Sequence, residues 1–137
     1  MRNGRPYGLA LLAEALALRD KHGAALAAVE EGLQTQETTG QRTWDAELHR
    51  LKGIALLGQN KREESRSAFE ESLRIARRQQ VRAYELRAAT SLARLWGEDG
   101  KRTEARDLLA PVYGRFTEGF DTPDLREAKA LLDGLAS

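Results

Sequence analysis

The chain repeats one pattern of small and large apolar residues every 40 positions. Small residues recur at the first and third positions of this pattern, and large apolar residues recur at the second and fourth. The aligned sets are Ala13, Leu16, Ala25, Val29 and Gly32; Gly53, Leu56, Ser65, Phe69 and Ser72; and Ala93, Trp96, Ala105, Leu109 and Val112. Turn-forming residues recur at the same offset, around Lys21, Lys61 and Lys101. A fixed period in this range indicates a solenoid, in which each unit packs on its neighbours.

The composition indicates one helical domain without disulfides or a strong electric field. The length of 137 residues is that of a single domain. There are 22 Lys and Arg residues against 21 Asp and Glu residues, so no long-range field would attract nucleic acid. The absence of cysteine excludes disulfides and thiolate metal sites. The most apolar stretch, Leu9 to Leu18, contains Glu14 and is too short to span a membrane. We therefore expect a cytoplasmic protein that binds neither nucleic acid nor membranes.

Helical periodicity and turn residues divide the chain into three helical hairpins and a final single helix. Gly40 favours a stop after the second helix, Thr43 is a plausible cap for the third, and Thr122-Pro123 is a typical helix start. Residues 1–6 are expected to form a disordered tail. The helices of the hairpins are predicted at about 7–19, 24–37, 43–57, 62–79, 82–98 and 103–116. The three repeats thus cover about 7–40, 43–80 and 82–118, and a helix at about 123–136 is expected to cap the open end.

The repeated unit resembles the tetratricopeptide repeat. That family places small residues where the two helices of a hairpin approach closely, and large residues between hairpins. In the middle unit the pattern is followed by Gly53, Leu56, Ser65, Phe69 and Ser72. The third unit departs from it at Val112, and the period of 40 exceeds the usual 34. The resemblance covers nearly the whole chain and implies an all-α, right-handed superhelix that binds a protein or peptide on its concave face.

Three stretches resemble a narrower group of proteins. Residues 46–53, 86–96 and 119–125 look like the repeat region at the C-terminal end of large bacterial signalling proteins. Those proteins place such repeats after an ATPase module, often with a nucleotide-cyclase or DNA-binding domain at the front. This resemblance implies an alternative function, in which the repeats are a regulatory region that contacts other domains of a multidomain signalling ATPase, cyclase or transcriptional regulator.

The first predicted helix is apolar on nearly every side, with Glu14 as its interruption. Its counterparts in the later units are more polar, since His49 stands where Leu9 does and Glu98 where Leu18 does. A helix that is apolar all round needs neighbours all round. We therefore expect this helix to contact an upstream repeat or a second copy of the chain, which would form a homodimer. The alternative is a first repeat whose leucine side chains lie partly in water.

No arrangement of residues in the sequence predicts catalysis or a bound metal. His22 and His49 fall in different units and lack paired cysteine or carboxylate spacing. Residues 97–101 lack the spacing of a phosphate loop and follow a predicted helix instead of a strand. The basic cluster at residues 74–82 surrounds a predicted helix end, where the helix dipole favours cations. We therefore expect a non-catalytic scaffold that is not an enzyme and carries no cofactor.

The resemblance also implies which residues contact a partner, because the first helix of each tetratricopeptide hairpin lines the concave face. Arg50, Arg87 and Arg94 could converge on an acidic group of that partner, since a guanidinium matches a carboxylate with paired hydrogen bonds. The alternative is that Arg50 pairs with Glu47 and that the other two arginines only solubilise the surface. The expected partner-binding residues are Glu14, Glu47, Arg50, Ile54, Arg87, Thr90 and Arg94.

Overall fold

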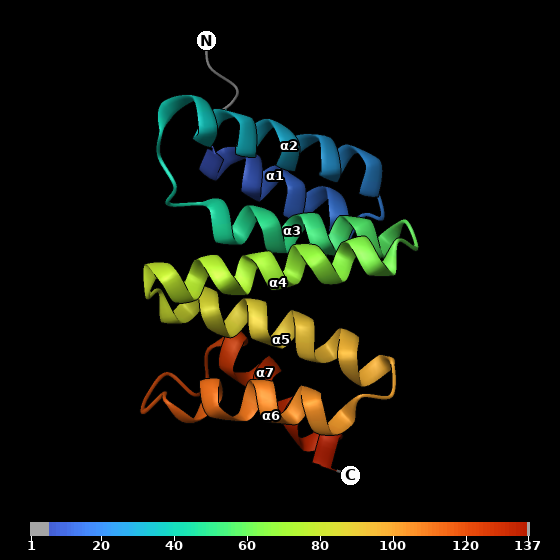
Figure 1. Ribbon diagram of the computed structural model, residues 1–137, viewed down its shortest axis with the longest axis vertical. Coiled ribbons are helices and arrows are strands. Elements are labelled where there is room, and N and C mark those ends of the chain that lie inside the picture. The colour runs from blue at the N-terminus through green and yellow to red at the C-terminus, as the bar shows by residue number, and fades with distance from the viewer. Residues whose placement is uncertain (1–5, 137) are drawn as a thin grey trace.

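The computed structural model describes residues 6–136, and within this range it consists of helices joined by turns and short loops, without a strand (Figure 1). The predicted all-α fold class is therefore confirmed. The expected disordered tail lies mostly in residues 1–5, outside the described residues. None of the helices in the described range is long and apolar enough to cross a bilayer. The helices are α1 (Pro6–Leu18), α2 (His22–Thr39), α3 (Asp45–Gly58), α4 (Arg62–Gln79), α5 (Arg82–Glu98), α6 (Arg102–Gly114) and α7 (Pro123–Ala136).

The helices form a stack in which α1, α3, α5 and α7 share one side. In the described range α1 contacts α3, α3 contacts α5, and α5 contacts α7. By contrast, α2, α4 and α6 contact only the helices that adjoin them in sequence. Figure 1 shows the helices layered along the long axis, with α1 and α2 at one end and α7 against α5 and α6 at the other. The layers therefore approach each other more closely on the side of α1, α3, α5 and α7.

Three turns within this stack have the same geometry at intervals of 40 residues. Each turn contains one residue with positive φ, at Asp20 (61°), Asn60 (64°) and Gly100 (85°). Asp, Asn and Gly are the residue types that tolerate this left-handed conformation best. The following lysine then donates its backbone N–H to a carbonyl five residues earlier, with distances of 2.9, 2.9 and 2.8 Å. These bonds join Lys21 to Leu16, Lys61 to Leu56, and Lys101 to Trp96.

The small residues of the repeat permit close contact between helices α3 and α4. A Cβ atom built on Gly53 would lie 2.4 Å from Cε1 of Phe69, so a side chain at this position would collide with the ring. Ser65 and Ser72 lie on α4 and are buried. The Ser65 hydroxyl donates to the carbonyl of Gly53, and the Ser72 hydroxyl donates to that of Ala46, each at 2.7 Å. The small side chains therefore allow both ring packing and hydrogen bonds between the helices.

The observed helix ends agree with the sequence prediction for α4, α5 and α7 and differ elsewhere. Helix α2 begins at His22, two residues earlier than expected, and α6 ends at Gly114 instead of residue 116. The prediction that Thr43 caps α3 was wrong, because Trp44 precedes the helix and no side chain caps it. Gly40 does end α2, with φ of 77° and a backbone hydrogen bond to Gln36.

The buried side chains form one core among α1, α2 and α3, a second among α4, α5, α6 and α7, and a smaller cluster of Ala46, Ile75 and Ala76. Ile54, on α3, packs against both cores and so connects them. Leu125, Ala128 and Leu135 place the apolar face of α7 in the second core. Helix α7 therefore covers apolar surface of α5 and α6.

Helix α1 leaves large apolar side chains in contact with solvent. The exposed fraction is 82% for Leu18, 48% for Leu12 and 50% for Leu11. The opposite side of the helix is buried, because Leu9, Ala10 and Ala13 pack in the first core. The chain itself therefore covers only one side of this largely apolar helix.

Candidate functional site

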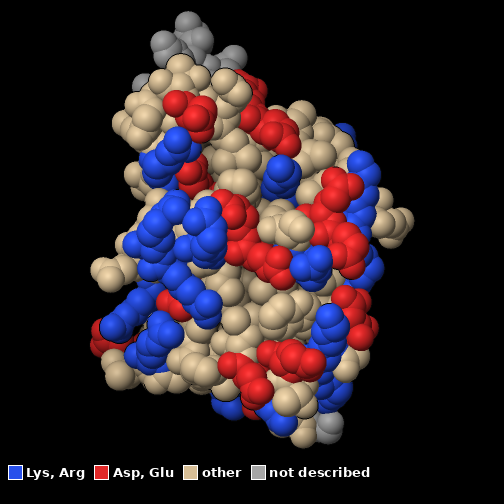
Figure 2. Space-filling view, viewed as in Figure 1, with Lys and Arg blue, Asp and Glu red and all other residues tan. Residues whose placement is uncertain are grey.

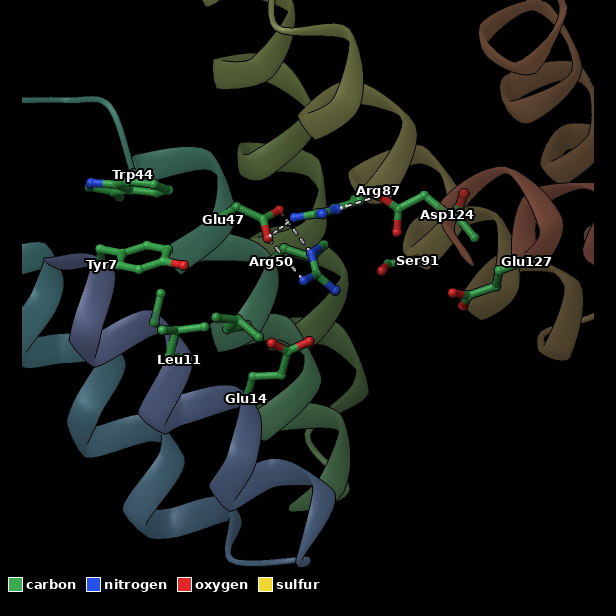
Figure 3. Close-up of a pocket in the computed structure, with 13 residues that line it drawn as sticks. Tyr7, Leu11, Glu14, Trp44, Glu47, Arg50, Arg87, Ser91, Asp124 and Glu127 are labelled. Carbon is green, nitrogen blue, oxygen red and sulfur yellow. Dashed lines mark hydrogen bonds and ion pairs between the residues drawn. The ribbon is translucent and has the colours of Figure 1, made fainter. Parts of the chain in front are cut away.

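A cavity of about 340 Å³ opens on the side of the stack formed by α1, α3, α5 and α7 (Figure 3). We call this cavity the groove. One aromatic residue that precedes α3, Trp44, also lines it. Its lining residues are Tyr7, Ala10, Leu11, Glu14, Trp44, Glu47, Arg50, Leu51, Arg87, Thr90, Ser91, Asp124 and Glu127.

Most lining residues fall into columns whose members lie 40 positions apart. One column begins with Tyr7 and continues through Glu47, Arg87 and Glu127, which takes one residue from each of the four helices. A second column contains Ala10, Arg50 and Thr90, and a third contains Leu11, Leu51 and Ser91. The period read from the sequence thus relates residues that line the same surface in successive layers.

The centre of the groove is an ion-pair network around Glu47. Its carboxylate is 9% exposed and accepts three hydrogen bonds. Arg50 donates two of them, from Nε and Nη2, each at 3.1 Å. Arg87, one layer further along, donates the third from Nη1 at 2.9 Å. The forked guanidinium of Arg50 matches both carboxylate oxygens, which fixes the geometry of the pair.

Arg87 extends this network to the last helix. Its Nε donates to Asp124 of α7 at 2.7 Å, so α3, α5 and α7 are joined through charged side chains. Burial opposes the charge of Arg87, but the hydrogen bond to Asp124 and the field of Glu47 outweigh it and raise the pKa of the guanidinium. Arg94, also on α5, pairs with Glu127 at 2.7 Å. These contacts hold three arginines in fixed positions along one wall.

The other end of the groove is aromatic and apolar. The rings of Tyr7 and Trp44 lie 4.9 Å apart between centroids and are tilted by 39°. Tyr7 is 54% exposed, and Leu11 lies one turn further along α1 with half of its surface accessible. The ring of Trp44 also lies beside that of Tyr84, with 6.5 Å between the two ring centroids. The groove therefore offers an apolar surface beside a charged one (Figure 3).

Five of the predicted partner-binding residues line the groove: Glu14, Glu47, Arg50, Arg87 and Thr90. The two others do not. Ile54 packs between the two cores, and Arg94 lies outside the lining, paired with Glu127. Thr90 contributes little polarity, because its hydroxyl is buried and donates to the carbonyl of Leu86 at 2.7 Å.

The pairing of Arg50 with Glu47, which was the alternative reading of the sequence, is the one observed. Arg87 and Arg94 also bind carboxylates of their own chain, through Asp124 and Glu127. Arg50 and Arg87 meet at Glu47, and all three arginines are already paired with carboxylates instead of being open to an acidic group.

Sequence reasoning missed the aromatic end of the groove and the contribution of α7. The period could have indicated both, because subtracting 40 from Glu47 gives Tyr7 and adding 40 to Arg87 gives Glu127. Assigning residues 123–136 only a capping role obscured the fact that α7 follows α5 on the same side of the stack. The other missed lining residues are Ala10, Leu11, Trp44, Leu51, Ser91 and Asp124.

A second cavity, of about 510 Å³, lies where α4 and α6 end and α5 begins. Its lining includes Arg77, Arg82 and Arg115 around Glu85. Glu85 is buried and accepts hydrogen bonds from Arg77 at 3.2 Å and from Arg115 at 3.0 Å. Basic side chains also gather along this edge in Figure 2. Because a buried carboxylate neutralises part of this charge, the edge is a weaker candidate for a binding site than the groove.

Comparisons with known proteins leave the function to be argued from geometry alone. The chain matches no protein-family model, no curated protein and no solved structure. Among residues 6–136, no three His, Cys, Asp or Glu side chains are arranged to hold a metal ion. The groove combines fixed ion pairs with accessible aromatic surface, which is chemistry suited to binding a polypeptide segment.

Proposed function

We propose that this chain is a non-catalytic binding module of the tetratricopeptide type, a right-handed stack of 40-residue units that takes a protein or peptide segment into the groove. The observation that carries the proposal is the register of the lining residues. Three columns with a spacing of 40 residues run through α1, α3 and α5, and one of them continues to Glu127 on α7, so that the four helices line one surface. A surface built from four successive layers suits an extended or helical ligand better than a compact small molecule.

The ion pairs inside the groove favour binding on a preformed surface. Glu47, Arg50 and Arg87 hold one another in place before any ligand arrives. A ligand therefore does not have to order these long side chains, each of which would otherwise cost about 0.5–1.5 kcal/mol on association. The rigid rings of Tyr7 and Trp44 offer contact area at a similarly low entropic cost.

Selection of binders from a library of random peptides tests this proposal. Ser91 lies half-buried in the groove wall, so Ser91→Trp places a large ring in the cavity. Ser67 is exposed on α4, away from the groove, and Ser67→Trp makes the same chemical change there. We expect selected peptides to bind the unmodified protein and Ser67→Trp equally, and to lose binding to Ser91→Trp. Far-UV circular dichroism checks that both variants are folded.

Equal binding of the selected peptides to both tryptophan variants would show that they contact another surface. A library that gives no reproducible binder would also count against the proposal. Because the two variants carry the same substitution, general stickiness of an added tryptophan affects both and cancels in the comparison.

Self-association is a second candidate function, and the exposed leucines of α1 favour it. The side chains of Leu12 and Leu18 are 48% and 82% exposed, so the helices of their own chain leave them largely uncovered. Burying such side chains contributes about 1.5–3 kcal/mol each. We expect the weight-average mass in sedimentation equilibrium to rise with concentration and to stay monomeric for the double variant Leu12→Gln, Leu18→Gln. A monomer at every concentration before substitution would remove this candidate.

A further inference from the structure

The inference rests on the proposed function and concerns the chemistry of the ligand. We propose that the groove recognises a basic polypeptide segment, one that presents a lysine or arginine beside a large apolar side chain. The cation pairs with Glu14, and the apolar side chain packs on Tyr7, Trp44 and Leu11. The sequence alone favoured an acidic partner, and the arrangement of charges in the groove reverses that expectation.

The positive charges of the groove are already occupied. Arg50 binds Glu47 through two hydrogen bonds, and Arg87 bridges Glu47 and Asp124. Arg94, at the edge, pairs with Glu127. An acidic ligand would have to displace a carboxylate that is already well placed, and would leave that carboxylate without its partner. The Glu47 side chain is 9% exposed, so leaving its carboxylate unpaired is costly and makes Arg50 and Arg87 poor anchors for an anion. The half-exposed pair of Arg94 and Glu127 carries little of this cost.

The negative charges of the groove are in excess. Four carboxylates line it, from Glu14, Glu47, Asp124 and Glu127, and three of them are held by the arginines just described. Glu14 has no ion pair with any residue in the range 6–136. Its carboxylate is exposed and projects into the groove from α1 (Figure 3). The charge that remains available to a ligand is therefore negative.

The neighbours of Glu14 suit the apolar part of such a ligand. Tyr7, Leu11 and Glu14 follow one another on α1 at helical spacing and all line the groove. With a rise of 1.5 Å per residue, Tyr7 and Glu14 lie about 10 Å apart along the helix axis. That span accommodates an apolar side chain on the rings of Tyr7 and Trp44 and the stem of a lysine over Leu11. The ring of Tyr7 also attracts a cation through its π face.

Sequencing the peptides selected on the protein tests this inference separately from the proposed function. We expect the peptides that lose binding to Ser91→Trp to be enriched in lysine or arginine next to Trp, Phe, Leu or Met. Replacing the critical lysine of one such peptide by norleucine keeps the apolar stem and removes the charge. We expect this change to weaken binding about tenfold, and higher salt to weaken the original peptide.

The matching protein variants are Glu14→Gln and Glu31→Gln. Glu31 is exposed on α2, which contributes nothing to the groove lining, so its variant controls for the loss of one negative charge. We expect Glu14→Gln to weaken the lysine peptide about tenfold and to leave the norleucine peptide unchanged, with Glu31→Gln within about twofold for both.

Groove-dependent peptides that are acidic or uncharged would overturn the inference and leave the proposed function intact. Equal loss of affinity in Glu14→Gln and Glu31→Gln would also overturn it, because long-range charge would then explain the effect. The absence of any groove-dependent peptide would remove the proposed function together with the inference.

Discussion

Replacing Glu47 by glutamine tests whether the ion-pair network fixes the groove. Glutamine has the shape of glutamate, but one carboxylate oxygen becomes an NH₂ group that would face the guanidiniums of Arg50 and Arg87. Glu47 accepts two hydrogen bonds from Arg50 and one from Arg87, at 2.9–3.1 Å. Arg50 has no other ion-pair partner in the described range, whereas Arg87 keeps Asp124. The variant therefore leaves Arg50 without a counter-charge at a site that is mostly closed to water.

The expected loss of stability follows from the burial of the partners. Removing one member of a fully buried pair costs about 3–5 kcal/mol, and an exposed pair contributes about 1 kcal/mol or less. The side chains of Glu47 and Arg50 are 9% and 14% exposed, but Arg87 is 37% exposed, so solvent screens part of the network. We therefore expect Glu47→Gln to lower the free energy of unfolding by about 2 kcal/mol, which lowers Tm by about 6 °C in a domain of this size.

Urea unfolding followed by circular dichroism measures this difference, and Glu30→Gln is the control. Glu30 pairs with Lys52 at 3.7 Å, and both side chains are substantially exposed. That variant should cost about 0.5 kcal/mol or less. Equal losses in the two variants would show that the network is a solvated set of surface charges and does not stiffen the groove.

Three further predictions concern the helix packing, a half-buried histidine and a turn. Gly53→Ala should destabilise the protein by about 1 kcal/mol in urea unfolding, because its Cβ would collide with the ring of Phe69, and the loss should shrink in a Phe69→Leu background. Burial lowers the pKa of His49 in the folded protein, so the unfolded chain binds a proton at a higher pH than the folded one, and stability falls as pH drops below the ordinary value of 6.5. His49→Gln should flatten this pH dependence, which urea titrations on either side of that pH would measure. Gly100→Ala should cost about 1 kcal/mol in thermal unfolding, because φ at this position is 85°, whereas Asn60→Gly at the equivalent turn should cost less.

The helical fold and the position of three of its turns could be predicted because the same turn signals recur three times in the sequence. Turn residues that tolerate positive φ precede Lys21, Lys61 and Lys101, and the three turns adopt one geometry. Small residues such as Gly53 and Ser65 mark where helices approach closely. The prediction failed at Thr43, because its side chain is a good cap only if the helix begins just after it. Here the chain first turns at residues 42–45, with Asp45 drawn to the amide of Gln36 at 2.8 Å.

The ion pairs of the charged side chains were harder to predict than the helices that carry them. Helical spacing and the period place Arg50 and Arg87 on one surface, but pairing depends on distances between layers, which no local pattern contains. The bond between Arg87 and Asp124 needs α7 to lie against α5, and the capping role assigned to residues 123–136 did not predict that contact. Arg50 and Arg87 line the groove and Arg94 lies outside it, and the pairing of all three with carboxylates became visible only in three dimensions.

The two ends of the stack differ, and this limits how copies of the chain could assemble. At one end α1 presents Leu12 and Leu18, whereas the outward residues of α7 include the charged pair of Lys129 and Asp133. A filament grows only when the head of one copy fits the tail of the next. If two copies associate through α1, the apolar surface of one copy would meet that of the other with two-fold symmetry. Such a contact would consume the surface that forms it, so the expected product of self-association is a closed pair.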